Sequence, residues 1–513
     1  MKRKMKVVSL LLAVSLITTM VTACSSNNKN NSNPSNEANA GQATENTGKA
    51  ALEPYEITMA LPIFGAEPKD MAEVEAAINK ITQSKINATV DILPISIGAY
   101  SQQMNLMFSG GEKLDLGFTF GSGGMYNAAA ASGKLLQIDD LLKEYGQGIT
   151  EAVGEQYVNV PKVNGKLYGV PIVDAYAKGT DYYLRKDLVD KHQIDVASIE
   201  TLDDVENVLK TIKEKEPNII PLGVSPGLGP VTSFADYDGL GDRLGVLPGY
   251  DNALKITNLF ETEEYADKLC RVHKWFKAGY INKDAATTTV LPNAQIKAGR
   301  TFSAIYPSSP GQKEGIELEV GYELVRAELY PPHAATGSVM SGLWTIAQHS
   351  ENPERAMMFL NLMYSDKDIA NLLVWGIEGK HHIKISDTTA DYPEGLDINT
   401  VGYNMKSFVW IMGNQRLSYL SKTDNPKLRE IELGYEAQSI PSKAMGFLFD
   451  EGPVKNEGVA LKNVIEQYAQ SLETGTVDPE KRLKEFNDKL KAAGIEKYMA
   501  EKQKQLDTWA STK

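Results

Sequence analysis

The chain has 513 residues and a formal net charge of −13, with 53 Lys and Arg against 66 Asp and Glu. This negative charge excludes a nucleic-acid partner, because phosphate backbones would be repelled. Its only cysteines are Cys24 and Cys270, so stability has to come from a buried core, for which the chain is long enough. Length and composition therefore predict a soluble, mixed α/β protein of two or more domains.

The N-terminal segment has the pattern of an export signal. Residues 1–6 read Met-Lys-Arg-Lys-Met-Lys, and residues 7–21 are almost wholly apolar and carry no charge. This run is short for a membrane-spanning helix, which needs about 20 apolar residues. It ends in Val-Thr-Ala before Cys24, a spacing that resembles the bacterial lipobox. We therefore expect residues 1–23 to be a signal peptide, and lipidated Cys24 to be held at the extracellular face of the cytoplasmic membrane.

The segment after Cys24 is rich in Asn, Ser, Gly, Ala and Glu. It has too few bulky apolar residues to offset its ordering entropy, so residues 24–52 are predicted to form a disordered tether behind the lipidated cysteine. A coil of this length has an r.m.s. span of about 26–31 Å.

The first part of the body alternates strands and helices. Strands are expected at residues 55–61, 88–95 and 115–120, and helices at 70–84 and 100–109. Such alternation predicts a mostly parallel sheet covered by helices. The short apolar run at residues 167–172 contains Gly and Pro, and it is interpreted as a segment that crosses between domains.

A second block of elements follows. Strands are expected at 182–184, 219–224 and 337–347, and helices from 187, at 203–215 and at 262–277. Thr201 and Asp204 have capping-box spacing, and Asn352-Pro353 begins another helix. Residues 481–509 are predicted to be helical and amphipathic. The expected division is 53–172 with 336–375 as one lobe, 173–335 with 376–460 as the other, and 461–513 as a helical C-terminal region.

Catalytic and metal-binding patterns are weak. Residues 223–227 match a nucleophile elbow around Ser225, but Pro226 has no N–H to stabilise an oxyanion. The pairs His381-His382 and Cys270/His273 lack further ligands at metal spacing, and Asp236 begins a calcium-like loop that is not completed. We expect no metal, no cofactor and no catalytic residue. The separation of two carboxylates is not visible in a sequence, so a surface-tethered glycosidase stays an alternative.

Aromatic and amide side chains gather at the expected ends of elements. Aromatic rings stack on the apolar faces of sugars, while Asp, Asn and Gln pair with sugar hydroxyls, so a cleft of this composition would suit a carbohydrate. The alternative for each aromatic residue is core packing. The residues are Phe120, Tyr126, Tyr176, Tyr182, Tyr183, Tyr306, Trp344, Trp375, Trp410 and Asn414.

Seven short segments in a fixed order carry a resemblance to a known family. They are residues 100–115, 131–142, 164–171, 185–188, 352–361, 376–381 and 477–480. The chain resembles the family 1 extracellular solute-binding proteins of ABC importers, and within them the LplA-like lipoproteins with a distinctive C-terminal region. The resemblance implies a type II periplasmic-binding-protein-like α/β fold with two lobes, a ligand cleft and a helical C-terminal extension. It also implies a non-enzymatic protein that delivers a carbohydrate, expected to be an oligosaccharide, to the subunits of a membrane permease. A ligand-sensing partner of a membrane receptor is the other alternative.

The resemblance also suggests ligand-binding positions. The loop after the strand that ends at Phe120 is expected to line the cleft, Tyr306 and Tyr182 or Tyr183 to offer platforms, and the region of Trp410 to cover it. Tyr306 stands where Trp is commoner in the family. The full expected set is Phe120, Gly121, Ser122, Tyr126, Asp174, Tyr176, Tyr183, Asp236, Tyr306, Trp344, Trp375, Trp410 and Asn414.

Overall fold

A computed structural model describes residues 52–121, 125–233 and 236–513. The predicted signal peptide, Cys24, the tether up to residue 51 and Ser122 lie outside the described residues. Within the described ranges, none of the helices combines the length and the apolar character needed to cross a membrane.

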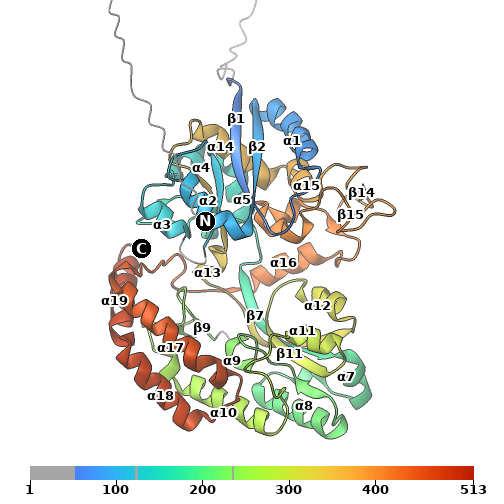
Figure 1. Cartoon of the computed structure of the whole chain (residues 1–513), viewed down its shortest axis with the longest axis vertical. Helices are drawn as coiled ribbons and strands as arrows, with labels where there is room; N and C mark the ends of the chain where they lie inside the picture. The colour runs from blue at the N-terminus through green and yellow to red at the C-terminus, as the bar shows by residue number, and fades with distance from the viewer. Residues whose placement is uncertain (1–51, 122–124, 234–235) are drawn as a thin grey trace, which may run out of the picture. The chain divides into compact units, whose positions relative to one another are not determined.

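The first lobe is built on a five-stranded sheet in the order β2-β1-β3-β13-β6. Its strands β1 and β2 lie side by side in Figure 1. Strands β1 (Tyr55–Ile63), β2 (Ala88–Ser96) and β3 (Leu116–Phe120) are parallel, and β13 (Gly342–Ile346) runs antiparallel to β3. β1 is buried from residue 57 to residue 63, as expected of a central strand with helices on both faces. The prediction of a mostly parallel sheet is confirmed here, with β13 as the exception.

Two predicted elements of this lobe are corrected. Residues 167–172 were expected to cross between lobes, but β6 (Gly169–Pro171) pairs with β13 and closes one edge of the first sheet. Val170 is fully buried in this position, so the apolar run has a core role. The strand expected from residue 337 begins only at Gly342, because Thr336–Val339 form the short helix α13.

Helices cover this sheet. α14 begins at Pro353 with the Asn352 side chain accepting the Arg355 N–H, as predicted. The next helix is capped by Asp366. The helices are α1 (Met71–Ile86), α2 (Ile97–Met107), α3 (Met125–Ala131), α4 (Asp139–Tyr145), α5 (Gln147–Val153), α6 (Glu155–Val158), α14 (Pro353–Ser365) and α15 (Lys367–Trp375), and β4 (Lys162–Val163) and β5 (Lys166–Leu167) form a small hairpin.

The second lobe has a sheet in the order β17-β12-β7-β11-β8. The long strand β7 (Ala177–Arg185) runs antiparallel to both of its neighbours, β11 (Thr301–Ser308) and β12 (Leu324–Ala334). The edge strands are β8 (Ile220–Leu222) and β17 (Ile440–Pro441). The helices of this lobe are α7 (Lys186–His192), α8 (Leu202–Lys215), α9 (Pro230–Ser233), α10 (Glu263–Lys277), α11 (Pro292–Lys297) and α12 (Gln312–Val320), and the predicted capping box of Thr201 and Asp204 is present at α8.

Residues 376–421 pack with the first lobe, which differs from the expected division at residue 375. Ala390, Tyr403 and Ile411 are buried in the same apolar cluster as β1 and β3. The reason is that this segment folds back over α15: the Trp375 indole N–H donates to the Tyr419 carbonyl at 3.0 Å. The segment contains β14 (Ile383–Lys384), β15 (Thr389–Asp391), β16 (Leu420–Ser421) and two 3₁₀ helices, η4 (Lys406–Ile411) and η5 (Gln415–Leu417).

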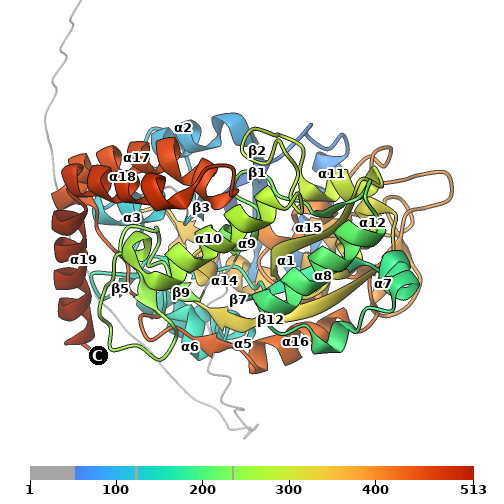
Figure 2. The same cartoon turned by 90° about the horizontal axis from the view of Figure 1, so that it is seen from below.

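The C-terminal region forms three helices on the second lobe, α17 (Lys455–Glu473), α18 (Pro479–Ala492) and α19 (Ile495–Ala510). α17 and α18 lie beside α10 (Figure 2). Leu461, Tyr468 and Phe486 share one buried cluster with Leu269 of α10. These helices are therefore part of the second lobe's core.

Candidate functional site

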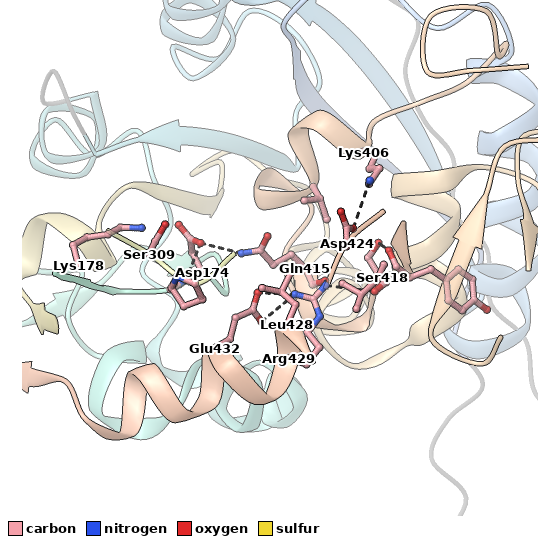
Figure 3. A pocket seen from close by; sticks show the side chains of 15 residues that line it. Asp174, Lys178, Ser309, Lys406, Gln415, Ser418, Asp424, Leu428, Arg429 and Glu432 are labelled. Carbon is pink, nitrogen blue, oxygen red and sulfur yellow. Dashed lines mark hydrogen bonds and ion pairs between the residues drawn. The ribbon is translucent and has the colours of Figure 1, made fainter. Parts of the chain in front are cut away.

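A pocket of about 210 Å³ lies where both lobes and α16 (Leu428–Ala437) contribute side chains (Figure 3). The first lobe supplies residues of η4, η5 and β16, and Asp174 and Ala175 come from the segment that crosses into the second lobe. Lys178 comes from β7, and Ser309 and Pro310 directly follow β11. The lining residues are Asp174, Ala175, Lys178, Ser309, Pro310, Lys406, Val409, Gln415, Ser418, Tyr419, Leu420, Asp424, Leu428, Arg429 and Glu432.

The polar side chains of this pocket are ordered by hydrogen bonds. Gln415 Nε2 donates to Asp174 Oδ1 at 2.9 Å, and the Ala175 N–H donates to the same oxygen at 2.8 Å. Arg429 donates to both Glu432 oxygens at 2.9 and 3.0 Å and to the Gln415 carbonyl at 2.7 Å. The pocket therefore presents hydrogen-bond donors and acceptors in fixed positions, and its side chains include both negative and positive charges.

Helix α16, which supplies Leu428, Arg429 and Glu432 to the pocket, is bonded to both lobes. Tyr435 Oη accepts the Gly179 N–H of β7 at 3.0 Å and donates to the Ser308 carbonyl at 3.2 Å. Glycine suits position 179, because a Cβ there would stand 2.8 Å from both the Tyr330 carbonyl oxygen and Tyr435 Oη. On the first-lobe side, Arg416 pairs with Glu436 at 2.5 Å. Burial raises the pKa of Glu436 despite that pairing.

An aromatic cluster forms around Phe408 and Trp410, which lie on the same 3₁₀ helix as the pocket residues Lys406 and Val409. Phe64 stacks on Phe408 with ring centroids 4.7 Å apart and an interplanar angle of 16°. Trp410 lies 5.8 Å from Phe64 and 6.4 Å from Phe120. All four rings are only partly buried. Phe64 follows β1 and Phe120 ends β3, so the cluster is at the carboxyl ends of parallel strands, where α/β sheets bind ligands.

The structure brings four of the expected site residues to this region. Asp174 lines the pocket, and Phe120 and Trp410 belong to the aromatic cluster. Gly121 follows directly, and a Cβ there would overlap the Met340 carbonyl oxygen, so only glycine fits.

Five expected residues are core residues in the structure. Each is at most 2% exposed, and its polar atom has a partner inside the protein; for example, the Trp344 indole N–H donates to the Ile411 carbonyl at 2.8 Å. They line no open surface, which corrects their assignment to the cleft. They are Tyr126, Tyr176, Tyr183, Trp344 and Trp375, and Tyr182 is buried likewise.

Three further expected residues have partners of their own. Tyr306 is 6% exposed and donates to Asn293 Oδ1 at 2.7 Å. Asn414 is 8% exposed and donates to the Tyr364 carbonyl at 3.0 Å. Asp236 forms an ion pair with Lys268 at 2.7 Å. These contacts fix the local chain rather than present the side chains to a pocket.

Several residues of the site were missed by sequence reasoning. Phe64 and Phe408 complete the aromatic cluster, and Lys178, Lys406 and Arg429 bring the positive charge of the pocket. The alternation of Phe408 and Trp410 in a segment without helical or strand periodicity was the available signal.

The residues that suggested a nucleophile or a metal site in the sequence have other contacts in the structure. No group of three metal-ligand side chains occurs among the described residues. Ser225 is buried in a tight turn in which its N–H donates to the Leu228 carbonyl at 3.0 Å. His381 Nε2 lies 3.0 Å from Asp70 Oδ2, and this contact, the largest cause, lowers the pKa of Asp70. Both motifs therefore have structural explanations.

Residues 65–370 match a family model described as bacterial extracellular solute-binding protein, and this range is more than half of the chain. The chain belongs to this family. Residues 443–511 match a second model, described as a domain of unknown function. The family places the protein on the extracellular side of the membrane.

Individual relatives agree with this assignment. A carbohydrate ABC transporter substrate-binding protein of Streptococcus pneumoniae is 29% identical over 481 residues, which are 92% of this chain and 94% of the relative. Lipoprotein LipO of Bacillus subtilis is 24% identical over 369 residues, 66% of this chain and 70% of the relative. The names of these relatives describe a substrate-binding protein and a lipoprotein, and the predicted LplA-like subgroup stays a prediction.

Solved structures confirm the predicted fold class. The N-glycan transport solute-binding protein NgtS of Streptococcus pneumoniae superimposes with a TM-score of 0.77 at 27% identity, covering 89% of this chain and 99% of that one. The same protein in complex with Man1GlcNAc gives a TM-score of 0.66, with 88% and 99% covered. The chain therefore shares with NgtS a type II α/β fold with two lobes and C-terminal helices.

Proposed function

We propose that this protein captures an oligosaccharide outside the cell and delivers it to the permease of an ABC importer, without catalysing a reaction. The observation that carries the proposal is the pocket shared by both lobes beside a partly exposed aromatic cluster. The relative that is 29% identical is named as a carbohydrate transporter component, and NgtS was solved with Man1GlcNAc and Man5GlcNAc.

The geometry supports binding by closure of the lobes around a sugar. Phe64, Phe408 and Trp410 offer ring faces to the apolar faces of sugar rings, while Asp174 and Lys178 offer an acceptor and a donor for hydroxyls. Recognition of this kind makes and breaks no covalent bond, so the ligand leaves unchanged when the lobes open.

Isothermal titration tests this proposal directly. The Cys24→Ala chain, titrated with Man1GlcNAc, Man5GlcNAc and linear glucans, is expected to release heat with at least one glycan and none with peptides. Heat with peptides only would refute the carbohydrate assignment. Hydrolysis of a bound glycan, followed by chromatography, would replace the proposal with the glycosidase alternative. Unchanged glycan uptake in a deletion strain would favour the sensing alternative.

We also propose that Cys24 carries the lipid anchor and that residues 25–51 are the tether. The support is the basic start, the apolar run and the small residues before Cys24. In Cys24→Ala cells, immunoblots are expected to show the protein moving from the membrane fraction to the medium. Mass spectrometry of the wild-type N-terminal peptide should show acylation. An unmodified Cys24 in membrane-bound wild-type protein would contradict this proposal.

A further inference from the structure

Residues 236–258 form a segment of the second lobe with very little regular structure. It contains only the two-residue strands β9 (Tyr237–Asp238) and β10 (Leu247–Pro248). Leu240 and Leu254 both adopt positive φ angles, of 50° and 55°, which are strained for residues with a Cβ. The segment has a few internal hydrogen bonds, such as the pair between Val246 and Thr257, and neighbouring elements hold it in place.

Helix α19 of the C-terminal domain holds one face of this segment. The Lys502 side chain is fully buried, with Nζ 2.6 Å from Asp242 Oδ1 and donating to the Leu244 carbonyl at 2.8 Å. The next residue, Gln503, accepts the Ile256 N–H at 2.7 Å and donates to the Leu254 carbonyl at 3.0 Å. Two adjacent residues of α19 therefore fasten the middle and the end of the segment.

The opposite face of the segment contacts the end of β12. The Tyr250 and His333 rings are 4.4 Å apart with an interplanar angle of 32°. Asp238 accepts a hydrogen bond from Ser442 Oγ at 2.5 Å, and the Ser442 N–H donates to the Ala334 carbonyl at 2.8 Å. His333 and Ala334 are the residues at which β12 leaves the second lobe.

This end of β12 is next to the pocket. His333 pairs in register with Lys178 of β7, and Lys178 lines the pocket. A continuous set of contacts thus joins the buried Lys502, the 236–258 segment, the Tyr250–His333 ring pair and Lys178.

We propose that Lys502 is a positioning residue for the binding pocket: it holds the 236–258 segment against the end of β12 and so fixes Lys178, which makes the C-terminal domain a part of ligand recognition. This inference rests on the proposed function. It gives the C-terminal helices a role beyond their packing in the core of the second lobe.

The test is a double-mutant cycle read by isothermal titration with Man5GlcNAc. The variants are Lys502→Met, Tyr250→Ala and the two combined, all in the Cys24→Ala chain. Lys497→Met is the matched control, because Lys497 is on the same helix but is largely exposed and pairs with Glu457. Each single variant is expected to raise Kd by about fivefold or more, with the control unchanged.

Coupling distinguishes positioning from a general loss of stability. Lys502 and Tyr250 are proposed to act through one set of contacts. The Kd of the combined variant is therefore expected to be no higher than the higher of the two single-variant Kd values. Hydrogen exchange in residues 236–258 should rise in Lys502→Met. Additive losses, or a Lys502→Met variant with faster exchange and unchanged Kd, would overturn the inference.

Lys502→Met leaves the Asp242 carboxylate without its cation. A second variant keeps the test decisive if Lys502→Met does not fold for this reason. Gln503→Ala removes the hydrogen bonds to Leu254 and Ile256 and one to Asp507 on the same helix, leaves the Lys502–Asp242 ion pair in place, and is expected to raise Kd in the same way. If the wild-type chain binds no glycan, the proposed function fails. If it binds and these variants bind equally well, only the role of α19 fails.

Discussion

Replacing Asp174 by asparagine changes the charge of the pocket and little else. Oδ1 of Asp174 accepts hydrogen bonds from Gln415 Nε2 and the Ala175 N–H. An asparagine side chain has the same shape and retains an acceptor for both donors. Asp174 lines the pocket, and among the ion pairs of the described residues none involves it, so no ion pair neutralises its charge.

The expected loss follows from the kind of hydrogen bond that a sugar hydroxyl makes. A bond to a charged acceptor contributes about 1.5–3 kcal/mol, and a neutral one about 0.5–1.5 kcal/mol. The difference of about 1–1.5 kcal/mol for one hydroxyl corresponds to a Kd raised by about five- to twelvefold. Asp174→Ala also leaves Gln415 without its acceptor, so it should lose more affinity than Asp174→Asn.

Titration with Man5GlcNAc measures both variants, and urea unfolding shows whether the fold is retained. Asp488→Asn is the control, because Asp488 is an exposed carboxylate on α18 that pairs with Lys484. It should bind like the wild type. An Asp174→Asn chain that is folded and has wild-type affinity would refute the assignment of Asp174 to the ligand site.

Three other outcomes are expected. Trp410→Ala should weaken glycan binding by about 2 kcal/mol in a titration, since a central aromatic contact is lost; a folded variant with unchanged Kd would contradict this. Thr201→Ala removes the cap of α8 and should lower the free energy of unfolding in urea by about 1 kcal/mol, and no change would show that the cap is dispensable. Burial lowers the pKa of His333 and of His382 in the folded chain. As the pH falls from about 7.5 through 6.5, the unfolded chain therefore binds more protons than the folded chain does, and the free energy of unfolding should decrease. His382→Asn should reduce that decrease in urea titrations, and an identical pH dependence would contradict the assignment.

Local sequence patterns predicted most of the fold correctly. The capping box at Thr201, the helix start at Asn352 and the first parallel strands depend on contacts within a few residues. Errors occurred where distant packing decides the structure. Gly169–Pro171 is a strand only because β13, far along the chain, offers a free edge.

The site was harder to predict for the same reason. Trp344, Trp375 and Trp410 have the same chemistry, but two are buried and one is partly exposed, and that depends on which segment covers each ring. The contact of Asp174 with Gln415 joins residues 241 positions apart. A periodic sequence pattern does not indicate a contact between such distant residues. The kinds of side chain in the site could therefore be predicted from the sequence, but the residues that form it could not.

The placement of residues 376–421 in the first lobe bears on how binding works. η4 is tied to β13 by the hydrogen bond from Trp344 to the Ile411 carbonyl and to α15 by the Met405 N–H, which donates to the Val374 carbonyl at 3.0 Å. The aromatic cluster is therefore built by one lobe and is ordered by folding, so a sugar that stacks on it does not have to order these rings. On the proposed function, the contacts that depend on closure are those of α16, β7 and the end of β11. Substitutions in the aromatic cluster should then weaken the binding of all glycans to a similar degree. Substitutions in α16, β7 and the end of β11 should instead change the affinity for one glycan relative to another.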